Sequence, residues 1–130
     1  GSSLWVAVLQ SGNIYTSDDD WDSATERSSA TGTSHNWGVV YAGGNINKWV
    51  ISSSSGKISY SSDGISWTAA TSGTTDHLYG IATDDTTIVI VGSSGTILTS
   101  PDGINWTSRT SNVSVTLRNV ACDIIGAGMR

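Results

Sequence analysis

The 130-residue sequence has only one cysteine, one proline and no phenylalanine. The single cysteine, Cys122, excludes an intramolecular disulfide framework and a multi-cysteine zinc cluster. Charged residues make up 13% of the chain and the net charge is -5, so the basic surface expected of a nucleic-acid-binding protein is missing. No apolar run approaches the roughly 18 residues of a membrane-spanning helix. We therefore expect neither a nucleic-acid partner nor a membrane partner.

Glycine and tryptophan, in contrast, are plentiful, with 15 and six residues. Together with many serines and threonines, the glycines predict numerous turns, and no segment has convincing helical periodicity. At this length the chain has the size of one domain, residues 1–130, with a lean hydrophobic content of 37%. The composition predicts an all-β fold.

The sequence is organised as three copies of one repeat. In each copy an apolar β-prone run leads to a glycine, at Gly12, Gly56 and Gly95, and an isoleucine follows two residues later. A serine, an aspartate and a tryptophan come next. In the second and third copies they form the motif Ser-x-Asp-Gly-x-x-Trp, over residues 61–67 and 100–106. The first copy is degenerate, because it lacks the glycine of this motif.

The tryptophans that close the three copies are 46 and 39 residues apart, a spacing typical of propeller blades. They are Trp21, Trp67 and Trp106. A further strand-like element begins at His35 and again at His77, and a third one spans residues 117–121. Each repeat thus holds about four short β-prone runs. These features predict a β-propeller with three encoded four-stranded blades.

The repeat is offset from the ends of the sequence. It starts with the second strand of a blade, residues 5–8, and finishes with a first strand, residues 117–121. Because propellers typically have four to eight blades, three encoded blades favour a six-bladed homodimer, in which the C-terminal strand of each chain completes the first blade of the other. The alternative is that the sequence is part of a longer tandem array, whose open sheet edges also favour association.

The motif Ser-x-Asp-Gly-x-x-Trp resembles the Asp-box of the sialidase-type (BNR-repeat) β-propellers, with one residue fewer between the aspartate and the glycine. The resemblance extends over almost the whole chain, three times. It implies that the motif is a turn between the third and fourth strands of a blade, with structural aspartates and tryptophans. They are Asp19, Asp63, Asp102, Trp21, Trp67 and Trp106. Similar repeats occur in secreted bacterial and phage structural proteins, which leaves the location open while slightly favouring an extracellular or virion-associated one.

The other tryptophans divide into two groups when the copies are compared. Trp5 and Trp49 match Ile88, an apolar position in the second strand, so we expect both in the core. Trp37 is matched by Tyr79 and by an arginine, on the first strand, which lines the central channel of a propeller. Polar-tipped and variable side chains at this position indicate a ligand site. The predicted ligand-binding residues are Trp37, Tyr79, Arg118, His35, His77 and Asp76.

Two interpretations of these six residues remain. In the first, aromatic faces and polar groups bind a small ligand or glycan, because the apolar face of a sugar packs on aromatic rings. In the second, the side chains only fill or solvate the channel. The histidines do not predict a metal site, because a zinc site needs three or four ligands and the third copy has Thr116 in their place. No cofactor is expected.

The residue inventory argues against an enzyme. The resemblance to sialidases implies three arginines, a tyrosine-glutamate pair and an acidic aspartate. Of the four arginines only Arg109 and Arg118 lie in repeated elements, and the only glutamate, Glu26, belongs to no repeated motif. We therefore predict no catalytic residues. The expected function is a non-enzymatic binding module, with a glycan as the first candidate ligand. The alternatives are a structural or assembly propeller of a phage or cell-surface protein and a glycoside hydrolase-like fragment.

Overall fold

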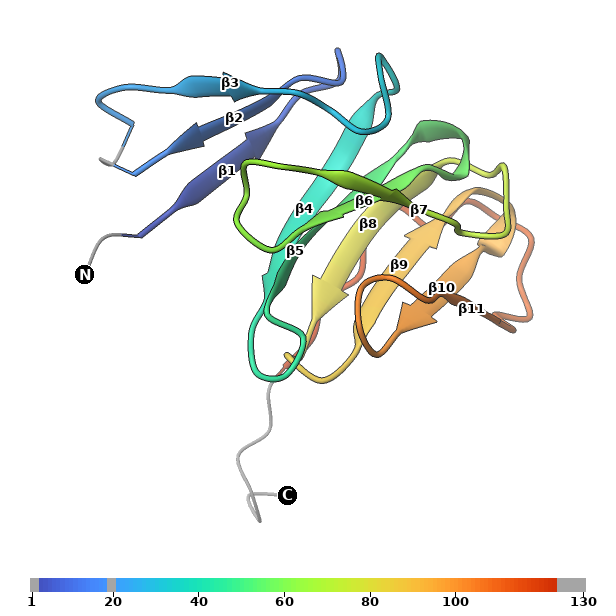
Figure 1. The fold of residues 1–130 in the computed structure, drawn as a ribbon. Coiled ribbons are helices and arrows are strands. Elements are labelled where there is room, and N and C mark those ends of the chain that lie inside the picture. Colours follow the sequence, from blue (N-terminus) through green and yellow to red (C-terminus); the bar gives the residue numbers. More distant parts are fainter. Residues whose placement is uncertain (1–2, 19–20, 124–130) are drawn as a thin grey trace.

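The computed structural model describes residues 3–18 and 21–123, and in them the strands form three separate antiparallel sheets (Figure 1). Sheet A consists of β1 (Trp5–Val8), β2 (Ile14–Ser17) and β3 (Thr25–Arg27). Sheet B consists of β4 (Asn36–Ala42), β5 (Lys48–Ser53), β6 (Ile58–Ser61) and β7 (Thr68–Ala70). Sheet C consists of β8 (Leu78–Thr83), β9 (Ile88–Gly92), β10 (Ile97–Ser100) and β11 (Thr107–Arg109).

The three sheets repeat one arrangement. In sheets B and C the four strands follow one another as an antiparallel meander, and sheet A contains the counterparts of the last three strands. The strands β4 and β8 lie side by side and β1 lies against β4, so the sheets succeed one another in chain order (Figure 1). The all-β prediction is confirmed, and the arrangement is compatible with that of propeller blades. The described residues do not form a closed ring.

A tight turn follows the second strand of sheets B and C. The 3-10 turns η1 (Ser54–Gly56) and η2 (Ser93–Gly95) connect β5 to β6 and β9 to β10. Gly56 has a φ of +73°, and a Cβ atom at this position would lie 1.8 Å from the carbonyl oxygen of Thr74. A Cβ atom on Gly95 would lie 2.0 Å from the carbonyl oxygen of Val113. The close backbone approach and the positive φ explain why this position of the repeat is glycine.

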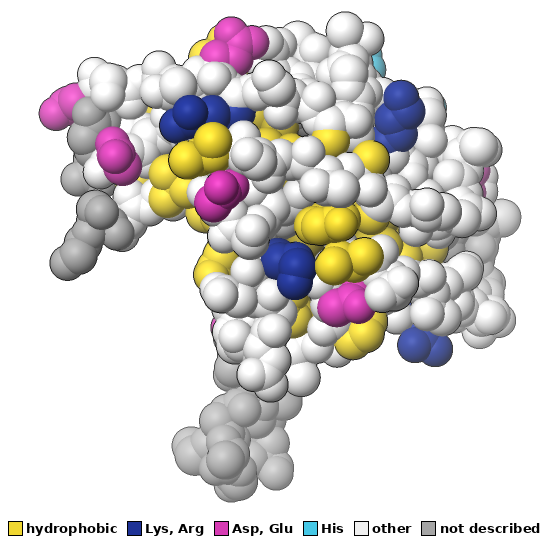
Figure 2. All heavy atoms as spheres, viewed as in Figure 1, with side chains coloured by type: hydrophobic (Ala, Val, Ile, Leu, Met, Phe, Trp, Pro, Cys, Tyr) yellow, Lys and Arg dark blue, Asp and Glu magenta, His cyan; other side chains and the backbone are white. Residues whose placement is uncertain are grey.

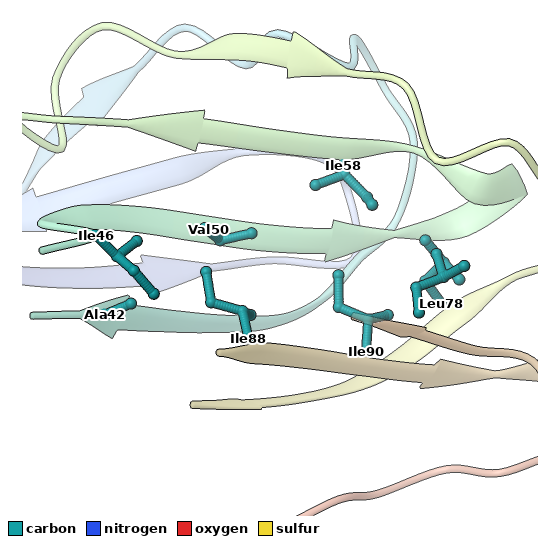
Figure 3. Close-up of a cluster of buried hydrophobic side chains, with 8 residues drawn as sticks. Ala42, Ile46, Val50, Ile58, Leu78, Ile88 and Ile90 are labelled. Atoms are coloured by element: carbon teal, nitrogen blue, oxygen red, sulfur yellow. The ribbon is translucent and has the colours of Figure 1, made fainter. Parts of the chain in front are cut away.

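The main hydrophobic core lies between sheets B and C (Figure 3). It is built from aliphatic side chains of the segments β4 to β6 and β8 to β10. The buried members are Ala42, Ile46, Val50, Ile58, Leu78, Ile88, Ile90 and Leu98. Burial of each large aliphatic side chain contributes about 1.5–3 kcal/mol. In the described part of sheet A, Ile14 is the fully buried apolar side chain. Sheets B and C therefore form the packed unit that positions the site.

The prediction that Trp5 and Trp49 are core residues is wrong for Trp5, whose side chain is 48% exposed. Trp49 is half-buried and packs on Tyr41, with the ring centroids 5.0 Å apart. Ile88, the counterpart of Trp5 and Trp49 in sheet C, is fully buried. Strand pairing explains the difference. Strands β5 and β9 pair on both edges, whereas β1 pairs only with β2 within residues 3–18 and 21–123.

The strand predicted at residues 117–121 is not formed. This segment has no sheet partner among the described residues and is not assigned as a strand. The N–H of Leu117 donates to the carbonyl oxygen of Gly92 at 2.9 Å. The backbone then packs against β8, where a Cβ atom on Gly80 would lie 2.8 Å from the Cα atom of Asn119. The segment is thus held at the side of sheet C without joining it.

The Ser-x-Asp-Gly-x-x-Trp motif of the second copy lies in the turn between β6 and β7. A carboxylate oxygen of Asp63 accepts hydrogen bonds from the N–H groups of Ile65 and Ser66 at 2.9 and 3.0 Å. The hydroxyl oxygen of Ser61 accepts the N–H of Gly64 at 2.8 Å. The bonds from Ser66 and Ile65 are the main reason why the pKa of Asp63 is lowered from its ordinary value. Asp63 is therefore a structural residue of this turn.

The turn between β10 and β11 repeats these bonds around Asp102. Partial burial acts to raise the pKa of this carboxyl group, but hydrogen bonds from Asn105, from the Ile104 N–H and from Ser100 outweigh it. The pKa of Asp102 is lowered to about 2. The structural interpretation of both aspartates is confirmed.

Sheet A departs from the pattern at the same place. Asp19, predicted to be structural, lies outside the described residues. The N–H of Trp21 donates to Ser17 Oγ at 3.0 Å, and its φ is +72°. The N–H of Gly64 makes the same bond to its own serine, with a φ of +76°. Trp21 thus occupies the place of the motif's glycine and not, as the spacing of the copies predicted, that of its tryptophan. Its side chain is 42% exposed.

Candidate ligand-binding site

The two aromatic residues predicted to bind a ligand lie at equivalent irregularities of the first strands. In the pairing of β4 with β5, Asn36 lies opposite Ser53 and Gly38 opposite Ser52, so Trp37 is left in a β-bulge. The pairing of β8 with β9 skips Tyr79 in the same way. A bulge changes the direction in which a side chain points. The repeat therefore places Trp37 and Tyr79 at matching points of neighbouring sheets.

The rings from these positions meet to form a continuous cluster, which we call the aromatic ladder. The ring centroids of Trp37 and Tyr79 are 5.1 Å apart, in an edge-to-face arrangement. His35 flanks Trp37 at 5.8 Å, and His77 flanks Tyr79 at 6.0 Å. The guanidinium carbon of Arg118 lies 4.8 Å from the centre of the Tyr79 ring, a cation-π geometry. Five of the six predicted residues are thus brought together.

Serines of the tight turns hold the ladder in place. The indole N–H of Trp37 donates to Ser54 Oγ at 2.9 Å, and the backbone N–H of His77 donates to Ser93 Oγ at 3.0 Å. The backbone N–H of Ser55 donates to His77 Nδ1 at 3.1 Å. These serines are not among the site residues predicted from the sequence. The repeated Ser-Ser-Gly of η1 and η2 was the signal that could have identified these partners.

The two histidines are oriented by different backbone groups. His77 Nδ1 accepts a hydrogen bond, so the neutral ring carries its proton on Nε2. His35 Nδ1 bonds the carbonyl oxygen of Gln10, which requires the proton on Nδ1. Both imidazoles are exposed. His77 therefore offers solvent a donor, and His35 offers an acceptor.

Asp76, the sixth predicted residue, is directed elsewhere. One of its carboxylate oxygens accepts the hydroxyl of Thr96 at 2.7 Å, and its backbone N–H donates to Thr74 Oγ1 at 3.1 Å. These contacts tie the loop before β8 to the turn after β9. Asp76 thus helps to fix the loop that precedes His77, and its carboxylate does not join the ladder.

The ladder is partly open to solvent. Trp37 and Tyr79 are half-buried, and Arg118 is exposed, like both histidines. The turns around Asp63 and Asp102 lie at the opposite end of the sheets. In sheet B, Ser61 is in register with Trp49 and Trp49 with Tyr41, at the end of β4 far from Trp37. The structural carboxylates are therefore separated from the ladder.

The groups that a sialidase-like reaction would need are dispersed. Glu26 lies on β3 of sheet A and accepts a hydrogen bond from Asn13. Arg109 lies on β11, where its Nε donates to Thr99 Oγ1 at 2.9 Å, and Arg118 lies beside β8. The arrangement does not join these arginines and Glu26 in one cluster.

A surface hollow of about 710 Å³ includes no ladder residue in its lining. It is lined by Ala30 and Thr31 of the β3–β4 connection together with Lys57, Ala70 and neighbouring small residues. Figure 2 shows one face of the molecule, where most of the surface is uncharged and the charged side chains are scattered. This face carries no basic patch.

Comparison of the sequence with protein-family models gives no match, and comparison with curated proteins gives none either. In residues 3–18 and 21–123 no group of three or more histidine, cysteine, aspartate or glutamate residues is placed to hold a metal ion. The same residues contain no helix of the length and apolarity required to cross a membrane. Function therefore has to be inferred from the ladder itself.

Proposed function

We propose that this chain is a non-enzymatic binding module of the β-propeller type, in which the aromatic ladder binds a glycan. The observation that carries the proposal is the edge-to-face contact of Trp37 with Tyr79, at a centroid distance of 5.1 Å. The two residues come from separate sheets and from equivalent bulges. The repeat therefore builds one composite aromatic surface from positions 42 residues apart in the sequence.

The chemistry of the ladder suits a sugar. Aromatic rings offer the apolar surface on which the C–H face of a pyranose packs, and nearby polar groups bond its hydroxyls. Here the half-buried rings of Trp37 and Tyr79 supply the apolar surface. The imidazole of His77 and the guanidinium of Arg118 supply exposed donors. An assembly of this composition favours a neutral or anionic glycan over a cation.

The exposure of His35, His77 and Arg118 argues against side chains that only fill the channel, because filling side chains are expected to be buried. Ligand binding and solvation of the channel are the two roles that fit exposed side chains. Binding is favoured because the ladder is oriented by hydrogen bonds that the Trp37 indole and the His77 backbone N–H donate to Ser54 and Ser93, which limits the conformational entropy that ligand binding would cost.

A structural or assembly propeller is the second candidate, and it is favoured by the edge of β1, which pairs with no strand other than β2 among the described residues. A glycoside hydrolase-like activity has less support, because Glu26 and Arg118 belong to different parts of the chain and the Asp-box carboxylates are engaged in turns.

A glycan array probed with the fluorescently labelled chain tests the proposal. Hits are then titrated by intrinsic tryptophan fluorescence or calorimetry. We expect Trp37→Ala and Tyr79→Ala each to weaken binding by about tenfold or more, equivalent to ~1.4 kcal/mol. The matched control is Tyr41→Ala, an exposed aromatic residue at the other end of β4, which should leave affinity unchanged.

The outcomes separate the candidates. Binding that is insensitive to both ladder variants would place the site elsewhere. An array without hits, obtained with a folded chain, would refute the glycan proposal and favour the assembly function.

A further inference from the structure

The edge of β1 lacks the partner that its counterparts have. Strand β5 lies between β4 and β6, and β9 lies between β8 and β10, but within the described residues β1 pairs only with β2. Trp5 of β1 is 48% exposed, whereas its counterpart Ile88 is fully buried. An unpaired edge with an exposed tryptophan is a surface for strand addition.

The segment that follows sheet C occupies the repeat position of the missing strand. Residues 117–122 belong to none of the three sheets among the described residues, and they match the first strands β4 and β8 in sequence position. Their packing matches as well. A Cβ atom on Gly38 of β4 would meet Ile81 and the carbonyl oxygen of Tyr79 on β8, and a Cβ atom on Gly80 of β8 would meet Asn119 and the carbonyl oxygen of Arg118. The segment thus sits on β8 as β8 sits on β4.

A second surface, on sheet C, also lacks a neighbour that its counterparts have. In sheets B and C the glycine of the Ser-x-Asp-Gly-x-x-Trp motif packs on the preceding sheet. A Cβ atom on Gly64 of sheet B would meet Val6 of sheet A, and a Cβ atom on Gly103 of sheet C would meet Val50 of sheet B. The counterpart of Val50 in sheet C is Val89. It lines a hollow of about 160 Å³ together with Val120 and Ala121. In sheet A the residue in the glycine's place is Trp21, which is 42% exposed.

We propose that two copies of this 130-residue chain associate by mutual strand exchange, in which residues 117–122 of each copy pair with β1 of the other. The pairings of β4 with β5 and of β8 with β9 specify the register. Residues 117–122 correspond to β4 and β8, and β1 corresponds to β5 and β9. The same register therefore places Val120 opposite Ala7 of the partner subunit, and Cys122 opposite Trp5 of the partner subunit. Trp21 of one copy then covers the hollow at Val89 of the other.

The exchange also extends the ligand site, a consequence that rests on the proposed function. Within one chain, Trp37 of sheet B contacts Tyr79 of sheet C, and Tyr79 contacts Arg118 of the segment after sheet C. With segment 117–122 completing sheet A of the partner subunit, Arg118 lies between its own Tyr79 and the partner subunit's Trp37. Each ladder is then continued by the other copy.

The native cysteine provides a site-specific test. Tyr41 and Trp49, which are register partners, have their rings in contact, so the equivalent pair, Cys122 and Trp5, should have adjacent side chains. The variant Trp5→Cys should therefore form a disulfide with Cys122 of the partner subunit under mild oxidation, seen as a covalent dimer on a non-reducing gel. The dimer should disappear when Cys122→Ser is added.

Leu9→Cys is the matched control, because Leu9 is also exposed but lies four residues further along, roughly 13 Å in an extended chain. It should cross-link little. The unmodified chain should have twice the 13.5 kDa mass of one chain in light scattering.

Three results would overturn the proposal: a monomeric mass for the unmodified chain, an oxidised Trp5→Cys species that is a monomer with an internal disulfide, or equal cross-linking of both variants. All of these readouts are independent of any ligand. A failure of glycan binding therefore leaves the strand exchange unaffected, and the converse also holds.

Discussion

Trp37 and Tyr79 occupy equivalent β-bulges of two neighbouring sheets, and their rings meet edge to face at a centroid distance of 5.1 Å. The contact joins sheet B to sheet C at the end opposite the turns around Asp63 and Asp102. An aromatic pair of this kind contributes about 0.5–1.5 kcal/mol beyond the burial of its surface. The ladder is therefore a structural connection as well as the proposed ligand surface, and mutations can separate the two roles.

Two substitutions of Trp37 should lower the stability of the chain by different amounts. Trp37→Phe removes the hydrogen bond to Ser54 Oγ but keeps a ring, so we expect the free energy of unfolding to fall by about 1 kcal/mol. Trp37→Ala also removes the ring contact with Tyr79 and should cost about 2–3 kcal/mol. Urea denaturation followed by circular dichroism measures both. Equal losses for the two variants would show that the ring contact contributes nothing.

Replacing Gly56 of the tight turn with alanine should destabilise the chain far more than replacing Gly73, another glycine with a positive φ. Gly73 has a φ of +81°, and a Cβ atom added there would meet nothing within 4 Å, so Gly73→Ala should cost about 1–2 kcal/mol from the backbone conformation alone. Gly56→Ala adds a collision with the carbonyl oxygen of Thr74, at 1.8 Å, and should be much more destabilising. Thermal denaturation of the pair gives the difference. Similar midpoints would contradict the close approach.

The core between sheets B and C should be sensitive to truncation. Leu78 is fully buried, so Leu78→Ala should lower the free energy of unfolding by about 2–5 kcal/mol through lost burial and the cavity left behind. Ile65 is 46% exposed, and Ile65→Ala should change stability by less than about 0.5 kcal/mol. Chemical denaturation monitored by tryptophan fluorescence tests the contrast. A small loss for Leu78→Ala would mean that the two sheets are not packed as described.

Asp102 should make stability depend on pH in the acid range. Its pKa is lowered from 3.8 in the unfolded reference to about 2, because hydrogen bonds from Asn105, Ile104 and Ser100 outweigh the effect of partial burial. A carboxyl group with a lowered pKa in the folded state contributes stability above its unfolded pKa and loses it as the pH falls. The contribution should therefore be present above about pH 4 and disappear toward pH 2.

The variant Asp102→Asn isolates this contribution. Its stability should be lower than that of the unmodified chain at pH 7, and the gap should narrow as the pH falls from about 4 to 2. Urea denaturation at a series of pH values measures it. A gap that stays constant down to pH 2 would contradict the assignment of these hydrogen bonds.

Local patterns were enough to predict a large part of this structure. The turns around Asp63 and Asp102 depend on residues within a few positions of each other, and the observed hydrogen bonds are those of the predicted turn. The equivalence of Trp37, Tyr79 and Arg118 followed from the spacing of the repeats. Because each copy builds the same element, equal positions in the sequence became equal positions in neighbouring sheets.

Other features were decided by contacts between distant residues. Trp5 was predicted in the core, yet its exposure depends on the strand beside β1, which is not specified by its own neighbours in the sequence. Trp21 matched a tryptophan by spacing, but its backbone takes the place of a glycine.

By itself, the sequence determined the all-β class, the repeat and the positions that vary between its copies. Only the tertiary structure decided that the rings of Trp37 and Tyr79 touch, that Ser54 orients the indole and that residues 117–121 join no sheet within the described part of the chain. The physical reason is that turns and strands follow from short-range hydrogen bonding and alternation of side chains. Burial, ring contacts and strand pairing depend instead on which sheet lies next to which.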